Sequence, residues 1–219
     1  MAIPVLIIGR SGSGKTYSLK NFGPNEVGVI SVEKGRLPFR SDIKVLKVPT
    51  DPTDGQAQDA AQLNAAKYAW INSVIQRSKA KSIVIDDSQY LLCFELFDRS
   101  GETGYTKFTE MAKHFYDLIQ TVIRKLPNDT IVYFLHHTEQ VGDKLKAKTI
   151  GKMLDEKLTV EGLFSIVLMA KNVDGKHFFL TQSDGSDTVK TPMEMFTDAE
   201  IDNDLKVVDT TIREYYGIK

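Results

Sequence analysis

The sequence predicts an α/β fold in which a mainly parallel β-sheet carries helices on both faces and an antiparallel hairpin in its C-terminal part. Apolar, β-branched runs alternate with segments of helical period, as in chains built from strand–helix–strand units. A glycine-rich stretch joins the first of these runs to a helix. Further along, Asp174-Gly175 separates two strand-like runs, a combination typical of a hairpin turn. We therefore expect one domain over residues 1–219.

The composition excludes several kinds of protein. The chain is 42% hydrophobic and 26% charged, as in an ordinary globular domain, and its formal net charge is −1. A chain of this charge has no general attraction for nucleic acid, so any such contact must be local. Its single cysteine, Cys93, excludes an internal disulfide and a cysteine-based zinc site. The apolar stretch 3–8 contains Pro4 and is too short to span a bilayer, so we expect a cytoplasmic protein without membrane contact.

The glycine-rich stretch fits the phosphate-binding pattern G-x-x-x-x-G-K-[ST]. An apolar strand at 5–8 precedes it, and a helix beginning at Tyr17 follows it. The backbone N–H groups of such a loop and the helix N-terminus favour a bound anion. We expect Lys15 to reach the β- and γ-phosphates of a nucleoside triphosphate and the Thr16 hydroxyl to contact Mg²⁺. The residues expected to contact the nucleotide are Gly9, Arg10, Ser11, Gly12, Ser13, Gly14, Lys15, Thr16 and Tyr17.

The remaining elements follow in alternation. Apolar runs predict buried strands at 27–32, 45–48, 83–86 and 131–135. Apolar residues at helical spacing predict helices at 57–77 and 108–126. The segment 98–107 is polar, contains two glycines and is expected to be a mobile surface loop.

The last predicted element is a helix over residues 198–216. Thr197 and Glu200 have the spacing of a capping box, which marks the start of a helix. The residues that follow carry a single apolar stripe.

Three acidic residues follow predicted strands and are candidates for the chemistry. Asp86 closes the apolar run 83–85, the position of an aspartate that holds Mg²⁺ through water in P-loop enzymes. Its neighbour Asp87 either positions a water molecule or caps the following helix. Glu33 ends the strand after the phosphate-loop helix, where it either orients the attacking water or is a solvated turn residue.

Two adjacent histidines end the strand at 131–135. Successive side chains of a strand point to opposite faces, so His136 and His137 should separate, one facing the γ-phosphate and the other packing in the core. A metal site made by both is not expected, because adjacent strand residues diverge and no third ligand is evident.

The segment 142–157 contains five lysines and little apolar periodicity; they are Lys144, Lys146, Lys148, Lys152 and Lys157. Lysine runs are usually solvated loops. Because this segment follows the strand with the two histidines, its lysines could instead contact nucleic-acid phosphates or the nucleotide of a neighbouring subunit.

With these residues placed, the chain resembles the RecA-like core ATPases. It is more closely similar to the short phage-encoded ATP-binding proteins of that group, which act in recombination and single-strand annealing. The resemblance rests on the loop at 9–16, the strand ends at Glu33 and Asp86 and the histidine pair, and it extends over roughly residues 1–216. It implies that the protein binds ATP and Mg²⁺, assembles into a homo-oligomer and acts on single-stranded DNA, with a single-strand-binding protein as a candidate partner.

The resemblance also implies roles for particular residues. It implies that Glu33 activates water and that one of the two histidines senses the γ-phosphate. It implies that two mobile loops, at 98–107 and 138–150, bind single-stranded DNA.

Further, it implies that Lys148 or Lys152 completes the site across a subunit interface. RecA carries an N-terminal polymerisation segment, whereas here the first strand begins at residue 3, which leaves a ring or a looser oligomer open.

Two other functions also use a P-loop. A helicase loader or remodelling ATPase of the AAA+ type needs an arginine finger after the sensor strand and a helical lid domain, and neither is visible in the sequence. A P-loop nucleotide kinase usually closes an arginine-rich lid over the phosphates, and the segment 142–157 has no arginine. We therefore favour the DNA-dependent ATPase over the loader, and the loader over the kinase.

Overall fold

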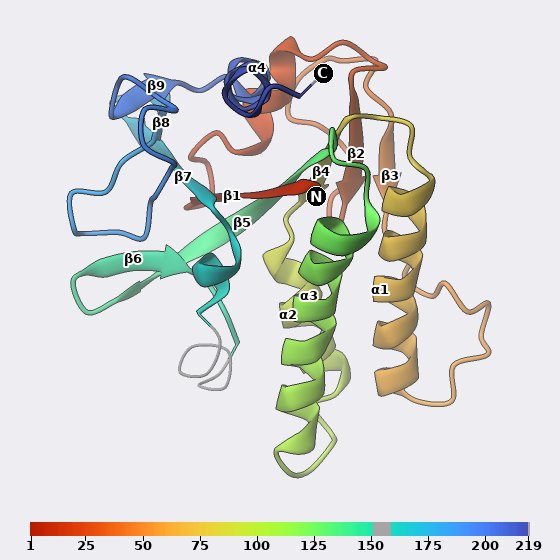
Figure 1. Ribbon diagram of the computed structural model, residues 1–219. Coiled ribbons are helices and arrows are strands. Elements are labelled where there is room, and N and C mark those ends of the chain that lie inside the picture. The colour runs from red at the N-terminus through yellow and green to blue at the C-terminus, as the bar shows by residue number, and fades with distance from the viewer. Residues whose placement is uncertain (151–158, 219) are drawn as a thin grey trace.

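The computed structural model describes residues 1–150 and 159–218 (Figure 1). It contains one sheet whose strands lie side by side in the order β3-β2-β4-β5-β1-β7-β8-β9, while β6 pairs with β5 alone. The parallel strands are β1 (Ile3–Gly9), β2 (Val27–Ser31), β3 (Val45–Lys47), β4 (Ser82–Asp86), β5 (Ile131–Val141) and β7 (Ile166–Val173). The antiparallel additions are β6 (Lys144–Ala147), β8 (Lys176–Leu180) and β9 (Glu200–Asp202). The predicted α/β class with a mainly parallel sheet is confirmed.

Helices cover both faces of this sheet. The helices α1 (Ala60–Arg77), α2 (Gln89–Asp98) and α3 (Thr106–Lys125) pack on one face, and α4 (Leu205–Tyr216) packs on the other together with the short 3₁₀ helix η1 (Thr16–Asn21) (Figure 1). The central strand β1 shows the consequence of this arrangement, because Leu6 and Ile8 join the α1–α3 side while Val5 and Ile7 join the α4 side. A strand buried on both faces is apolar at every position, which is why periodicity identified it as a continuous run.

The buried carboxylate of Asp209 fastens α4 to the sheet. It accepts hydrogen bonds from the Tyr133 hydroxyl at 2.8 Å and from the Ser82 hydroxyl at 2.7 Å. Arg213, one turn later on α4, donates to the same carboxylate at 2.7 Å and to the backbone carbonyls of Lys81 and Asp129. These contacts join α4 to β4 and β5, so the C-terminal helix is tied to the centre of the sheet.

The start of the C-terminal helix differs from the prediction. It begins at Leu205 and not at 198, because Asp204 is the residue whose carboxylate accepts the N–H groups of Lys206 and Val207. Glu200, expected in the capping box, lies in β9 and pairs with Leu180 of β8. Residues that the capping pattern assigned to the helix thus form the edge strand β9.

Two segments predicted as loops are more ordered than expected. Residues 144–147 form β6, which pairs antiparallel with the end of β5, so the N-terminal half of the lysine segment is one arm of a hairpin. The segment 98–107 includes Arg99, whose guanidinium is buried and forms ion pairs with Glu95, Glu102 and Glu110. Arg99 and Glu95 are buried in this cluster, whereas Glu102 and Glu110 are partly exposed, and the polar sequence does not reveal it.

No helix within residues 1–150 and 159–218 combines the length and apolar character needed to cross a membrane.

Candidate functional site

The ends of three adjacent parallel strands bring the candidate residues together. β5 lies between β1 and β4, and its register places His137 opposite Gly9 at the end of β1. Asp86 ends β4 on the other side of β5. The carboxyl ends of parallel strands meet at one edge, which is where α/β proteins place their ligands. A cavity of about 330 Å³ lies there, lined by Ser11, Gly12, Ser13, Gly14, Lys15, Thr16, Tyr17, Lys34, Pro38, Asp87, His137 and His177.

The glycines of the 9–16 loop are required by its geometry. Gly12 and Gly14 have φ angles of +76° and +100°, in the left-handed region that side chains disfavour. A Cβ atom on Gly9 would lie 2.5 Å from the Ser13 hydroxyl and 2.8 Å from the carbonyl oxygen of Ala170, too close for either. The loop can therefore fold tightly over the end of β1 only because these positions lack side chains.

The Lys15 ammonium is held inside the loop. Its side chain is 6% exposed, and Nζ donates to the backbone carbonyls of Gly9 at 2.7 Å and Arg10 at 3.0 Å. Burial lowers the pKa of Lys15 to about 8, although the nearby carboxylates of Asp87 and Asp86 act in the opposite direction. Because this ammonium is largely removed from water, an anion that enters the cavity would stabilise its charged form.

A hydrogen bond joins the loop to the neighbouring strand. The Thr16 hydroxyl donates to Asp86 Oδ1 at 2.9 Å, linking residues 70 positions apart. Asp86 is buried, and burial together with the charge of Asp87 raises its pKa to about 6. The hydroxyl oxygen of Thr16 and a carboxylate oxygen of Asp86 therefore lie side by side where burial and Asp87 disfavour the negative charge of Asp86. Such a pair suits a hard divalent cation.

Residues 1–150 and 159–218 contain no complete metal site made by side chains alone. Within the described part of the chain, no three His, Cys, Asp or Glu residues gather in a way that could hold a metal ion. Mg²⁺ usually keeps several water ligands and is bound by one or two carboxylates and the substrate phosphates. The pair formed by Thr16 and Asp86 fits this mode of binding.

Asp87 faces the cavity and does not cap a helix. Its φ angle is +60°, an unusual conformation for a residue with a side chain, and it turns the chain sharply after β4. Asp87 Oδ1 lies 3.3 Å from His137 Nε2, and Oδ2 lies 3.6 Å from Lys34 Nζ. The N-cap of α2 is Ser88, and its side chain makes no capping hydrogen bond. The interpretation of Asp87 as a helix cap is therefore wrong, and the interpretation that it positions water stays a prediction.

The charge state of Asp87 follows from these neighbours. Burial alone would raise the pKa of the carboxyl group, but the hydrogen bond from His137 and the positive charge of Lys34 outweigh it. The pKa of Asp87 therefore lies below its usual value. The two adjacent aspartates thus differ, since Asp86 holds its proton more tightly than usual and Asp87 less tightly.

Glu33 is not part of this cavity. It lines a different cavity, between the ends of β2 and β3 and the helices α1 and α2, whose other polar members are Lys47, Thr50, Asn64, Lys67, Tyr68 and Asp98. Glu33 and the pair Lys15 and Thr16 therefore line different cavities. Besides Asp86, which accepts from Thr16, the carboxylate beside the glycine-rich loop is Asp87, directly after β4.

The two histidines point to opposite sides, as the alternation of a strand predicts. His136 is fully buried, where Nε2 donates to the backbone carbonyl of Lys148 at 2.8 Å and Nδ1 lies 2.9 Å from the Ser88 hydroxyl. Burial lowers its pKa to about 4, so the ring is neutral near pH 7. His137 lines the cavity beside Asp87 and packs edge-on against Tyr90. His137 is therefore the sensor candidate, and His136 is structural.

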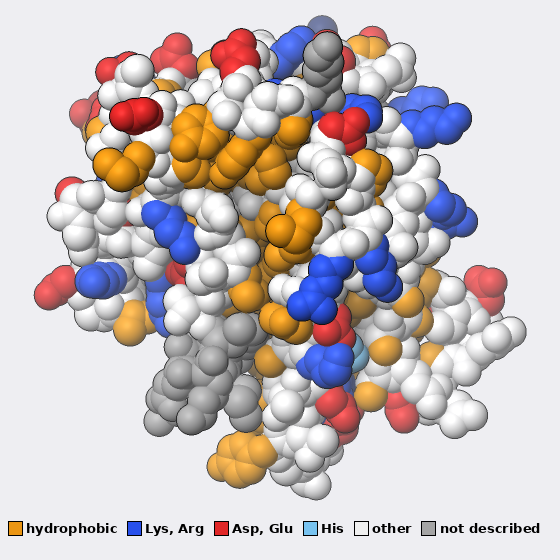
Figure 2. Space-filling view, viewed as in Figure 1, with side chains coloured by type: hydrophobic (Ala, Val, Ile, Leu, Met, Phe, Trp, Pro, Cys, Tyr) orange, Lys and Arg blue, Asp and Glu red, His pale blue; other side chains and the backbone are white. Residues whose placement is uncertain are grey.

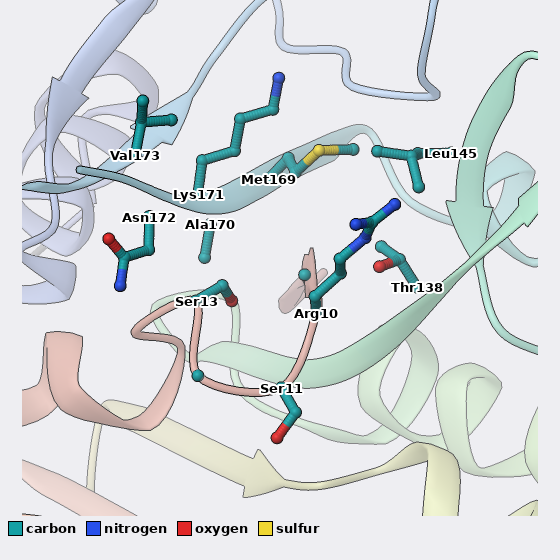
Figure 3. Close-up of a pocket in the computed structure, with 12 residues that line it drawn as sticks. Arg10, Ser11, Ser13, Thr138, Leu145, Met169, Ala170, Lys171, Asn172 and Val173 are labelled. Atoms are coloured by element: carbon teal, nitrogen blue, oxygen red, sulfur yellow. The ribbon is translucent and has the colours of Figure 1, made fainter. Parts of the chain in front are cut away.

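A second cavity, of about 560 Å³, lies on the other side of the same loop (Figure 3). Arg10 faces this cavity and donates to Gln140 Oε1 at 3.4 Å. Figure 3 shows Lys171 approaching it from β7 and Thr138 from β5. Arg10, expected among the nucleotide contacts, thus lies on the side away from Lys34 and Asp87.

The candidate DNA-binding lysines differ in their surroundings. Lys144 and Lys148 are exposed, whereas Lys146 Nζ lies 3.7 Å from Glu139 Oε1 across the hairpin. Lys152 falls outside the described residues. On the face shown in Figure 2, basic and acidic side chains are interspersed, so this face carries no broad basic field.

The two segments expected to bind DNA are not brought together. Figure 1 places the hairpin of β5 and β6 beside the sheet edge that carries the cavity. The segment 98–107 lies instead at the far end of α2 and α3, away from the sheet. Of the two, only the hairpin adjoins the candidate site.

Three residues of the site were missed by the sequence analysis. Lys34 reaches Asp87 from the turn after β2. His177, on β8, donates from Nδ1 to the Ser13 carbonyl at 3.0 Å, and Asn203, after β9, lies over Gly14. His177 and Asn203 come from the antiparallel edge, and no motif marks them. Only the order of strands brings them to the loop.

No model of a known protein family matches the chain, and a search of curated proteins finds no match either.

We predict that His136 makes the folded protein sensitive to acid. Between its pKa of about 4 and the usual 6.5, the unfolded chain binds a proton that the folded chain does not. The free energy of unfolding should therefore decrease as pH falls through this range, by up to about 3 kcal/mol from this group. Urea unfolding at pH 7 and pH 4.5 measures the change. The variant His136→Gln should show a smaller pH dependence, and an unchanged one would contradict this assignment.

Proposed function

We propose that this protein binds ATP at the 9–16 loop and hydrolyses it. The observation that carries the proposal is the hydrogen bond from Thr16 to Asp86, because it unites the two parts that a magnesium-dependent triphosphate site needs. The buried ammonium of Lys15 next to them supports it, since burial lowers the pKa of this group in spite of the carboxylates of Asp87 and Asp86. Ser13 Oγ and Asp87 Oδ2 are buried without hydrogen-bond partners among the described residues, which leaves polar atoms for a ligand.

In this proposal the loop binds the phosphates through its backbone N–H groups. Lys15 leaves the carbonyls of Gly9 and Arg10 and donates to phosphate oxygens. Thr16 and Asp86 hold Mg²⁺, which neutralises charge that develops on the phosphates when it is bound.

Asp87 and His137 then position the attacking water. Phosphoryl transfer depends on orientation and charge more than on a strong base, so a carboxylate that stays ionised suits the task. His137 Nε2 donates to Asp87 and fixes the direction of its second oxygen, which has no hydrogen-bond partner among the described residues. This role replaces the one that the resemblance gave to Glu33.

We further propose that single-stranded DNA binds along the hairpin of β5 and β6. Lys148 connects this hairpin to the site, because its N–H donates to the carbonyl of His137 at 2.8 Å and its carbonyl accepts from His136. A strand of DNA that shifts the hairpin would therefore move the residue that orients Asp87. The homo-oligomer and the trans-acting role of Lys152 rest on the resemblance to RecA-like ATPases alone.

The first test is binding of ATP to Lys15→Ala. Replacing the ammonium removes about two charge-assisted hydrogen bonds, so we expect affinity to fall about a hundredfold or more. Isothermal titration calorimetry in the presence of Mg²⁺ measures it, with circular dichroism to verify folding. A folded variant with unchanged affinity would refute the proposal.

A second prediction separates the two carboxylates. Asp87→Asn should retain ATP binding and lower turnover about a hundredfold, because the amide cannot orient water as the ionised carboxylate does. Glu33→Gln, the matched control at the neighbouring strand end, should hydrolyse ATP at nearly the rate of the unaltered protein. Phosphate release with and without single-stranded DNA measures both. Loss of turnover in Glu33→Gln alone would return the role to Glu33.

A third prediction concerns the hairpin. If Lys144 and Lys148 each neutralise one DNA phosphate, replacing both with Ala should flatten the slope of log affinity against log salt by about 1.4. Affinity should fall similarly for every DNA sequence, while ATP binding stays unchanged. Fluorescence anisotropy at several salt concentrations gives the slope. As a control, Lys113→Ala and Lys125→Ala on α3 should leave it unaltered, and an unaltered slope in the hairpin variant would mean that the hairpin does not bind DNA.

A further inference from the structure

A further cavity, distinct from the one that Arg10 lines and called the edge cavity below, adjoins the candidate phosphate site. It has a volume of about 290 Å³ and is lined by Tyr17, Lys20, Asn21, His177, Asp202, Asn203 and Asp204. Tyr17 and His177 line both cavities, so the two meet at these rings. Asp87 and His137, in contrast, line only the candidate phosphate site. A triphosphate with its terminal phosphate at Asp87 would leave the edge cavity, which adjoins at Tyr17 and His177, for its nucleoside.

The side chain of Asn203 lacks partners in this structure. It is 7% exposed, and neither Nδ2 nor Oδ1 makes a hydrogen bond within the described part of the chain. Its neighbours are already engaged: Asn21 donates to Asp204, and His177 donates to the carbonyl of Ser13. A buried amide with four unused hydrogen-bonding positions destabilises the free protein. A ligand that forms hydrogen bonds with it removes this cost and so binds more tightly.

The position of Asn203 is tied to the phosphate loop. A Cβ atom added to Gly14 would lie 3.0 Å from Asn203 Oδ1 and 2.7 Å from His177 Nδ1. The amide thus sits directly over the loop, beside the junction of the two cavities. Because no hydrogen bond holds it there, rotation about its side-chain torsions toward the cavity breaks none.

We propose that Asn203 is the residue that recognises the base of the bound nucleotide, and that the base is adenine. This inference rests on the proposed ATP site. An amide presents one donor group and one acceptor side by side, the arrangement that pairs with the exocyclic amine and the adjacent ring nitrogen of adenine. The rings of Tyr17 and His177, whose centroids are 6.1 Å apart, provide flat surfaces against which a base can stack.

The charges around the cavity favour a neutral base over a further phosphate. Asp202 and Asp204 both line it, and Lys20 is the basic residue among its described lining. Lys20 Nζ lies 4.6 Å from the centre of the Tyr17 ring, so its charge is directed at that ring. Carboxylates repel phosphate and accept hydrogen bonds from an exocyclic amine.

The test compares ATP, GTP and inorganic tripolyphosphate, which lacks a nucleoside. Calorimetry in Mg²⁺ should show that the unaltered protein binds ATP at least about tenfold more tightly than the other two. Asn203→Ala should weaken ATP about tenfold and leave tripolyphosphate within about twofold. Asn72→Ala is the matched control, because Asn72 on α1 also has a buried amide oxygen without a partner and lies outside both cavities.

A second variant keeps the test decisive if the first one is unstable. Asn203→Asp retains the shape but replaces the donor with an acceptor, so it should weaken ATP more than GTP, whose base offers two adjacent donors. Equal loss of ATP and tripolyphosphate in both variants would show that Asn203 only supports the loop and would overturn the inference. Unchanged ATP binding in both would also overturn it. If the unaltered protein binds neither ATP nor tripolyphosphate, the proposed function itself fails.

Discussion

The candidate site depends on the parallel pairing of β1, β5 and β4. Parallel strands in register end at one edge, so the residues that follow them are forced together whatever their separation in the chain. Here the pairing sets Gly9 opposite His137 and puts Asp86 one strand further along. The central runs of these strands, at 5–8, 83–85 and 131–135, are buried and hydrophobic because helices cover both faces, and a shift of register would bury polar groups. The packing of the core therefore positions the polar residues of the site.

Three buried ionisable groups lie close together at this edge of the sheet: Lys15, Asp86 and Asp87. Burial lowers the pKa of Lys15 and raises the pKa of Asp86. Burial does not raise the pKa of Asp87, because His137 and Lys34 lie beside its carboxylate. Charges interact strongly in a site that excludes water. An anion beside Lys15 and a cation beside Asp86 would therefore each stabilise the charged form of a buried group. This physical complementarity supports a magnesium–phosphate ligand more firmly than the loop pattern does alone.

Local patterns predicted the strands, the long helices and the loop, because each has a period or a turn chemistry that a short window contains. The choice between Glu33 and Asp87 could not be made from such patterns, since each closely follows a strand. Only the structure shows that Asp87, at a turn with φ of +60°, lines the cavity beside the loop while Glu33 does not. The start of α4 was predicted wrongly for a related reason. Thr197 and Glu200 have capping spacing, but pairing with β8 outweighs it.

The C-terminal third of the chain is what completes the loop's surroundings. β8 and β9 extend the sheet beyond β7, and this edge carries His177 and Asn203 back over Gly14. Gly14 must then be glycine for two independent reasons, its φ angle and the closeness of these side chains. The sequence pattern records only the first reason. A loop defined by residues 9–16 is thus shaped by contacts from residues about 160 to 190 positions later.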